Sequence, residues 1–198
     1  MGCLSLINHP QYDCLRCGVE LQSDHSVCGH CQILPPKFSQ VKYVGLYQAP
    51  IDLWVKALKF GKRILMSRLF AELMLPLLED IDSEYSLMPV PLHISRLRSR
   101  GYNQAYEIAK ELAKVTNRKL DTSLKRNKKT DMQAQLKLNQ RAKNVSNAFL
   151  LEGKLENKKF ILIDDVMTSG STLKECAKTL KKAGAEDIKI IVFARKSL

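Results

Sequence analysis

The chain has 198 residues, of which 45% are hydrophobic and 26% charged, and its formal net charge is +12. This balance is typical of a folded globular protein, and it excludes a chain that is mainly disordered, collagen-like or of low complexity. No stretch has the roughly 20 apolar residues of a membrane span, and the N-terminus lacks the features of a signal peptide, so we expect a cytoplasmic protein without membrane insertion.

Strands and helices are predicted to alternate along most of the chain. The last two predicted strands are apolar throughout, which is typical of strands buried in a parallel sheet. The alternation therefore indicates an α/β fold with a mostly parallel sheet. The expected elements are a strand over 41–47, helices over 50–60 and 64–78, a strand over 86–90, a helix over 103–114, a strand end running into a basic loop over 123–130, a polar helix over 135–143, a strand over 160–163, a helix over 171–183 and a strand over 188–193.

Four cysteines form two closely spaced pairs near the N-terminus, Cys14 with Cys17 and Cys28 with Cys31. Each pair can present two thiolates from one turn, and two such turns make a tetrahedral four-sulfur zinc site. Two disulfides or free thiols are the alternative, and a reducing cytoplasm disfavours the disulfides. Because four protein ligands close the coordination shell, we expect this zinc to be structural.

A domain boundary is expected directly after the cysteine cluster. Pro35 and Pro36 stand there, and such a pair is typical of a break between folded units. We therefore expect a zinc-binding module over residues 1–38 and a larger α/β domain over residues 39–198. Cys176 lies in a predicted helix of the larger domain, where we expect it to be part of the core.

The positive charge is concentrated in the middle of the chain. Residues 94–145 carry 14 basic and 4 acidic side chains, a net charge of +10. A phosphate-bearing partner is one explanation, and a solvated lysine-rich surface is the other.

The string FILIDDVMTSGST, over residues 160–172, carries the strongest chemical signal. A buried strand leads into Asp164 and Asp165, and a loop rich in hydroxyls and glycine then leads into a helix. Backbone N–H groups of such a loop and of a helix N-terminus bind anions. Since the two carboxylates would repel a phosphate, we expect them to face ribose hydroxyls or a divalent cation. The string indicates a ribose phosphate site, and a helix cap flanked by surface acids is the alternative.

This string resembles the phosphoribosyl-pyrophosphate signature of the type I phosphoribosyltransferases. Other parts of the chain are similar to the ComF family of competence proteins, although Tyr102 stands where many members have Phe. The resemblance implies a type I phosphoribosyltransferase fold with a hood, plus the N-terminal zinc module. It is carried by the four cysteines, by residues 58–61, 89–93 and 100–104, and by Arg96, Arg98, Leu124, Arg126, Thr130, Gln133, Leu138, Arg141, Asn144 and Phe149.

The resemblance assigns the loop and the two carboxylates to one ligand, phosphoribosyl pyrophosphate. Asp164 and Asp165 would be the catalytic residues, reaching the ribose hydroxyls. The 5′-phosphate would be held by Thr168, Ser169, Gly170, Ser171 and Thr172.

The pyrophosphate of the same ligand is assigned to an earlier segment. Arg96, Arg98 and Arg100 are the candidates to neutralise it, because arginine suits bidentate phosphate contacts, and a solvated basic surface is the alternative for Arg96 and Arg98. Mg²⁺ would be held mainly by the ligand itself, residues 127–135 would form the hood loop, and Lys59 is a weaker candidate for the site. The pyrophosphate loop itself would be Val90, Pro91, Leu92 and His93.

Two functions fit this resemblance. A competence protein would handle incoming single-stranded DNA in the cytoplasm during natural transformation, next to DNA-uptake proteins at the inner membrane. A metabolic phosphoribosyltransferase would join ribose 5-phosphate to a nucleobase or amine, and the sequence leaves open whether catalysis occurs. The candidates for DNA contacts are Arg96, Arg98, Arg100, Lys125, Arg126, Lys128 and Lys129.

Overall fold

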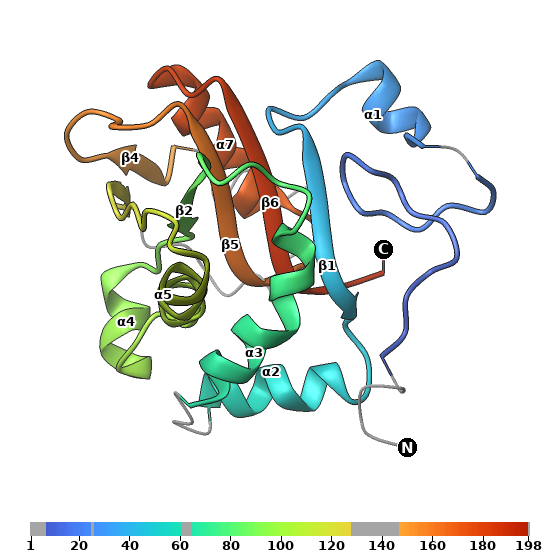
Figure 1. Ribbon diagram of the computed structural model, residues 1–198, viewed down its shortest axis with the longest axis horizontal. Helices are drawn as coiled ribbons and strands as arrows, with labels where there is room; N and C mark the ends of the chain where they lie inside the picture. Colours follow the sequence, from blue (N-terminus) through green and yellow to red (C-terminus); the bar gives the residue numbers. More distant parts are fainter. Residues whose placement is uncertain (1–6, 25, 61–64, 128–146, 198) are drawn as a thin grey trace.

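The computed structural model describes residues 7–24, 26–60, 65–127 and 147–197. No helix in these described ranges is long and apolar enough to cross a membrane. The elements, shown in Figure 1, are α1 (Gly29–Ile33), β1 (Gln40–Leu46), α2 (Ile51–Phe60), α3 (Met66–Met74), the 3₁₀ turn η2 (Leu75–Leu78), β2 (Ser86–Pro89), α4 (Ile94–Arg100), α5 (Gln104–Thr116), β3 (Leu124–Arg126), β4 (Phe149–Leu151), β5 (Lys159–Met167), α7 (Ser171–Lys182) and β6 (Asp187–Arg195).

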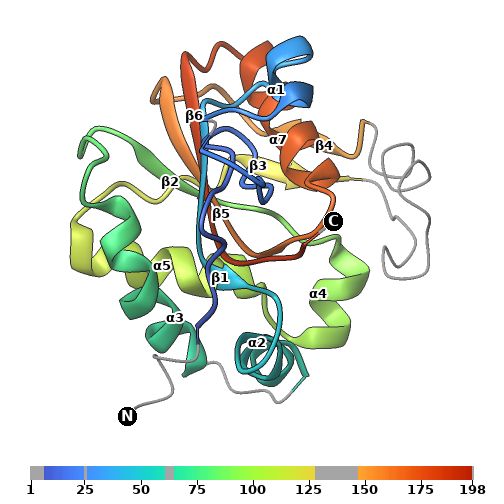
Figure 2. The ribbon, with the colours of Figure 1, turned by 90° about the vertical axis from the view of Figure 1, so that its right-hand side faces the viewer.

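A four-stranded sheet in the order β1-β6-β5-β2 forms the centre of the molecule, and every pair of neighbours in it is parallel. Parallel sheets are covered by helices on both faces because their crossover connections lie there. Figure 2 shows α7 on one side of the sheet and α3 and α5 on the other. The predicted α/β architecture is confirmed, and β3 and β4 add a small antiparallel pair.

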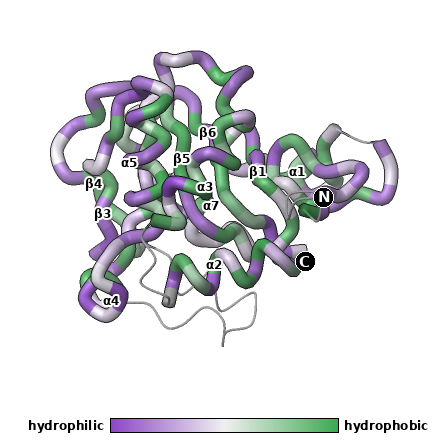
Figure 3. Tube along the Cα trace, turned by 60° about the horizontal axis from the view of Figure 1, so that its bottom comes forward, coloured by the Kyte–Doolittle hydropathy of each residue, from purple (hydrophilic) through white to green (hydrophobic). Residues whose placement is uncertain are grey.

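Two hydrophobic clusters fill the two faces of the sheet. Phe160 and Leu162 pack with α7 in one cluster, where Cys176 is fully buried as expected, whereas Ile161 and Ile163 pack with α2, α3 and α5 in the other. Figure 3 shows β5 and β6 as largely hydrophobic tubes inside the molecule. Because side chains alternate along a strand, consecutive residues of β5 face different helical layers.

Three elements differ from the sequence-based expectation. The helix expected over 64–78 ends as α3 at Met74 and tightens into η2, in which Pro76 has no N–H group to donate. Helix α4 was not expected, because none of its residues is buried and it has no apolar periodicity. Strand β5 continues four residues beyond Ile163, since β6 runs beside it as far as the Met167–Arg195 pair. The polar helix expected over 135–143 lies outside the described residues.

The part of the chain that contains the four clustered cysteines, residues 7–24 and 26–38, is called the cysteine-containing segment. It lies along the edge strand β1. Leu46 N donates to Asn8 O at 2.9 Å, and Val41 N donates to Leu15 O at 3.1 Å. Gly18 has a φ of +63°, and a Cβ there would lie 3.1 Å from Tyr43 Cε1, so glycine permits both the turn and the close approach. The segment therefore covers backbone groups that an edge strand would otherwise expose. The boundary between 1–38 and 39–198 stays a prediction.

Candidate functional site

Asp164 and Asp165 lie directly after the point where the pairing of β5 with β2 ends. The pairing of β2 with β5 ends at Ile163, whose carbonyl oxygen accepts a hydrogen bond from Val90 N at 2.9 Å. β5 then continues toward Met167, and the chain after β2 turns away into the segment 90–93. The proposed pyrophosphate segment therefore begins directly beside the two carboxylates, at the carboxyl edge of the sheet where ligands of such folds bind.

The two carboxylates face opposite layers of the protein. Asp165 is 7% exposed and forms an ion pair with Lys59 of α2, with Nζ 2.8 Å from Oδ2. Asp164 is half-buried on the α7 side, where it interacts electrostatically with Arg126 and Cys176. Lys59, a weak candidate from sequence, is thus part of the carboxylate site.

The protonation of Asp164 is set by its surroundings. Burial and then the negative charge of Asp165 raise the pKa of Asp164 to about 8, although its Oδ1 accepts a hydrogen bond from Asp165 N at 2.9 Å. Around neutral pH this carboxyl group therefore holds its proton. A bound cation, or a set of hydroxyl donors, would favour the ionised form.

The loop between β5 and α7 has the geometry of an anion cradle. Gly170 precedes the helix with a φ of +73°, and a Cβ there would come within 2.6 Å of Met167 Cε. Ser171 N donates to Ser169 Oγ at 3.4 Å, and the two serine hydroxyls lie 2.9 Å apart. Hydroxyl groups therefore gather at the N-terminus of the twelve-residue α7, the end of a helix that favours anions. Thr168 and Thr172 flank this turn on either side.

Arg195, which sequence reasoning missed, fixes the start of this cradle. The side chain is 3% exposed, and its Nη1 donates to Met167 O at 3.2 Å, to Thr168 O and to Lys196 O at 2.9 Å. Lys196 N adds a second donor to Met167 O at 2.9 Å. The only sequence signal was the position of an arginine directly after a run of buried apolar residues in β6.

The segment 90–93 is held by the first residues of α5. Asn103 Nδ2 donates to Val90 O at 3.0 Å, while Asn103 Oδ1 accepts from Ala105 N at 3.1 Å and so caps α5. The Tyr102 hydroxyl donates to Leu58 O, directly before Lys59. The neighbouring residues Tyr102 and Asn103 thus connect the segment 90–93, the start of α5 and the end of α2 that carries Lys59.

His93 has a local structural role at the end of this segment. Its Nδ1 accepts a hydrogen bond from Ser95 N at 3.2 Å and caps α4. Pro91, Leu92 and His93 are all partly exposed, so the segment is accessible beside the carboxylates.

The predicted basic residues separate into two groups. Burial lowers the pKa of Arg96 and of Arg126, and a neighbouring arginine lowers each further, Arg100 for Arg96 and Arg96 for Arg126. Arg126 also interacts electrostatically with Asp164. Arg100 Nη1 donates to Gln104 Oε1 at 3.0 Å. The three arginines thus follow one another away from the carboxylate edge, and such a group suits a polyanion.

The other predicted basic residues lie elsewhere. Arg98 is exposed on α4, and Lys125 pairs with Glu152, with Nζ 3.3 Å from Oε2. Lys128 and Lys129 lie outside the described residues, as does the expected hood loop over 127–135 except for Asn127.

The four clustered cysteines can hold one metal ion. The sulfur atoms of Cys14, Cys17, Cys28 and Cys31 all lie within 4.8 Å of one another, and those of Cys17 and Cys28 are 3.7 Å apart, too far for a disulfide. Burial by itself raises the pKa of Cys14, but hydrogen bonds from backbone N–H groups outweigh burial and bring this pKa to about 7. One of these donors is Cys28 N, 3.3 Å from the Cys14 sulfur. Cys14 therefore supports a thiolate, the form that binds a metal, whereas burial raises the pKa of Cys17 to about 11 and also raises that of Cys31.

The sheet and the loop at the start of α7 define a phosphoribosyltransferase fold, and the comparisons with known proteins agree. Residues 78–197 match the family model of the phosphoribosyl transferase domain. The chain is 33% identical to Competence protein F of Haemophilus influenzae, over 98% of this chain and 89% of that protein. It is 29% identical to DNA utilization protein YhgH of Escherichia coli O157:H7, over 92% and 83%. It is 26% identical to Competence protein ComFC of Streptococcus pneumoniae, over 85% and 74%.

The chain therefore belongs to the phosphoribosyltransferase family and, within it, to the ComF family of competence proteins.

Proposed function

We propose that this protein handles incoming single-stranded DNA in the cytoplasm during natural transformation, and that it binds phosphoribosyl pyrophosphate with Mg²⁺ at the carboxyl edge of its sheet. The observation that carries the ligand is the meeting of three parts at one edge: an anion cradle, two carboxylates and a group of arginines. The names of the related proteins support the pathway. Proteins of the DNA-uptake machinery at the inner membrane are the proposed partners.

Each part of the site matches one part of the ligand. The N–H and hydroxyl groups of residues 168–172 bind the 5′-phosphate, and Asp164 and Asp165 accept hydrogen bonds from the ribose hydroxyls. Arg96 and Arg100 balance the charge of the pyrophosphate beside the segment 90–93. Mg²⁺ would be held mainly by oxygens of the ligand and by water, because it prefers oxygen donors and keeps much of its hydration, and it would stabilise the charge of the pyrophosphate group.

Zinc is the proposed ion of the cysteine cluster. A tetrahedron with zinc–sulfur bonds of about 2.3 Å has edges of about 3.8 Å. The separation of 3.7 Å between the sulfur atoms of Cys17 and Cys28 fits this geometry, and the four sulfur atoms all lie within 4.8 Å of one another. With four thiolates in place, the ion has a structural role.

Titration calorimetry with phosphoribosyl pyrophosphate at millimolar Mg²⁺ tests the ligand. Asp164→Asn and Asp165→Asn should weaken binding by on the order of tenfold to a hundredfold, since Asp165→Asn removes a charged acceptor and Asp164→Asn removes a carboxyl group that the ligand would hold in its ionised form. Asp80→Asn is the matched control, because Asp80 pairs with Lys42 away from the site. Normal binding by both site variants would overturn the assignment of the ligand.

A complementation experiment tests the pathway. A strain that lacks the gene should regain natural transformation with the wild-type protein and with Asp80→Asn, but not with Asp164→Asn. Full transformation in the deletion strain would refute the competence role.

A metabolic phosphoribosyltransferase is the second candidate, because the cradle and both carboxylates of the transferase site are present. It predicts the release of pyrophosphate when a nucleobase or amine is added to protein and ligand. The two functions can therefore be distinguished with the same preparation.

A further inference from the structure

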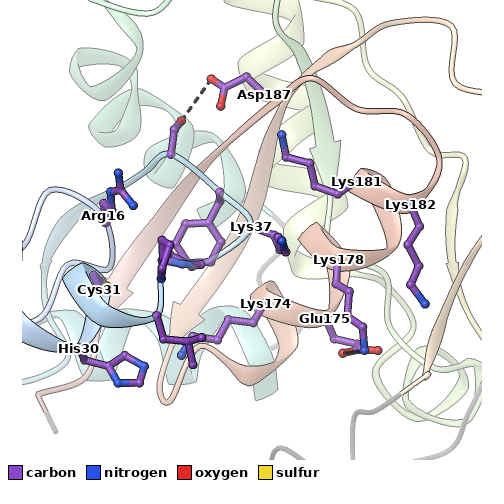
Figure 4. A pocket seen from close by; sticks show the side chains of 15 residues that line it. Arg16, His30, Cys31, Lys37, Lys174, Glu175, Lys178, Lys181, Lys182 and Asp187 are labelled. Atoms are coloured by element: carbon purple, nitrogen blue, oxygen red, sulfur yellow. Dashed lines mark hydrogen bonds and ion pairs between the residues drawn. The ribbon is translucent and has the colours of Figure 1, made fainter.

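A cavity of about 880 Å³ lies between the cysteine-containing segment and helix α7, away from the carboxylate edge. Figure 4 shows lysines of α7 along one side of it and Arg16, His30 and Lys37 along the other. No residue of this cavity was among the predicted DNA contacts. The fold builds it from two segments that are far apart in the sequence, so we call it the module–α7 groove.

The module–α7 groove has a strong excess of positive charge. Its cations are Lys174, Lys178, Lys181 and Lys182 of α7 together with Arg16 and Lys37, and its acidic residues are Glu175 and Asp187.

Both acidic residues already have partners. Glu175 Oε1 accepts from Asn147 N at 2.9 Å, and Asp187 Oδ2 accepts from the Tyr85 hydroxyl at 2.6 Å and from Ser39 Oγ at 3.2 Å. Lys178 is the only groove cation that forms an ion pair with another described residue, at 3.7 Å from Glu175. Most of the positive charge is therefore available to a ligand.

The lysines form a row that leads away from the anion cradle. Positions 174, 178, 181 and 182 lie on one face of α7, and Lys174 comes one turn after Gly170. With a rise of about 1.5 Å per residue, Lys174 and Lys178 are about 6 Å apart along the helix. Such a row can follow the successive phosphates of one strand.

The opposite wall also offers apolar side chains. Leu34, Pro35 and Pro36 line it together with Arg16 and Lys37, and the exposed ring of His30 lies on the same side. Unpaired bases offer flat faces to such surfaces, whereas the bases of a duplex are hidden and an acidic peptide has only carboxylates to offer the lysines.

We propose that the module–α7 groove binds single-stranded nucleic acid, with the phosphates along the lysine row of α7 and the bases against the wall formed by the cysteine-containing segment. This inference rests on the proposed function in DNA handling, and it assigns the contact to a surface outside the basic segment 94–145. Because the cysteine-containing segment forms one wall of the groove, the proposal also gives this segment a direct contact with the nucleic acid.

Fluorescence anisotropy with a labelled oligothymidylate of about 20 nucleotides tests the groove in the full-length protein. Lys174→Gln with Lys178→Gln removes two phosphate contacts, which should lower the slope of log affinity against log salt by about 1.4 and weaken binding at about 100 mM salt on the order of tenfold. Lys110→Gln with Lys114→Gln is the matched control. It removes the same charge at the same spacing from exposed positions of α5, and Lys114 likewise pairs with an acid three residues away.

The outcomes separate the groove from the wider proposal. A wild-type slope in the groove variant, or an equal loss in the control, would overturn the groove. If Arg96→Gln with Arg98→Gln lowers the slope and the groove variant does not, DNA binding stands and the contact belongs to the segment 94–145. Equal competition by polyglutamate or by duplex DNA would also overturn it. Binding of phosphoribosyl pyrophosphate should be the same in the groove variant as in the wild type, which shows that the substitutions leave the fold intact.

Discussion

Asp164 shows how a single residue can be placed for a ligand at a cost to the folded state. Its pKa is about 8 in the folded protein and near 3.8 in a model peptide. Between these pH values the folded chain keeps a proton that the unfolded chain has lost, so stability falls as the pH rises through this window. Below it, both states are protonated and the effect vanishes.

The variant Asp164→Asn should therefore melt like the wild type at about pH 4 and at a higher temperature at about pH 8. Differential scanning fluorimetry across this range measures the difference. Asp80→Asn should show no such gain, because its partner Lys42 lowers the pKa of Asp80. A lower melting temperature for Asp164→Asn at pH 8 would contradict the position of Asp164.

Arg195 is the second residue whose role can be isolated. It touches backbone carbonyls at the start of the anion cradle and no part of the proposed ligand, so it is a positioning residue. Arg118 is its counterpart away from the site, since it is also buried and donates to Ile81 O and Asp82 O.

Arg195→Met should weaken binding of phosphoribosyl pyrophosphate by about tenfold or more, because a hydrogen bond from a charged group contributes roughly 1.5–3 kcal/mol. Arg118→Met should lower the melting temperature about as much as Arg195→Met does, but it should leave the affinity for phosphoribosyl pyrophosphate unchanged. Partial recovery in Arg195→Lys would support positioning. Equal affinities for the two methionine variants would show that Arg195 acts only through stability.

Among the elements, β1 reports on the state of the cysteine cluster. The amides of Val41 and Leu46 donate to carbonyls of the cysteine-containing segment, whereas β6 lies inside the sheet. A segment of this size has little core of its own, so a metal ion bound by the four cysteines would supply much of its stability.

Removal of the metal with a chelator should therefore speed hydrogen exchange at the amides of Val41 and Leu46 and leave that of Val192 protected. Hydrogen-exchange mass spectrometry or NMR measures this, with readdition of zinc as the control. Faster exchange at all three amides would show that the cluster and the sheet unfold together.

The sequence predicted those elements whose signals are local. The cysteine pairs, the cradle string and the apolar runs of β5 and β6 each lie within a short stretch of chain. The length of β5 was underestimated because Asp164 and Asp165 are polar residues inside a strand. Helix α4 was missed because its signals are only the His93 cap and the positive φ of Gly101.

At the scale of the whole molecule, charge counted along the chain gave an incomplete picture. The segment 94–145 contains most of the net charge, yet Arg98 is exposed on α4 and Lys125 pairs with Glu152, whereas Arg126 interacts with Asp164. The module–α7 groove draws its cations from the two ends of the chain. The groove forms because the cysteine-containing segment lies beside the lysine-bearing face of α7. This packing joins distant parts of the chain, so no local sequence pattern predicts it.

The strand order has a consequence for how the protein is made. β1, near the start of the chain, is joined to the sheet through β6, the last strand, in the pairing of Gln40 with Lys189. During synthesis β1 and the cysteine-containing segment leave the ribosome long before their neighbour exists, and a contact of such sequence separation forms slowly. Arg195, in the same last strand, completes the anion cradle. A chain in which β6 has not yet been made therefore lacks both the neighbour of β1 and the arginine that supports the loop before α7, so we expect the proposed ligand to bind only after β6 has joined the sheet.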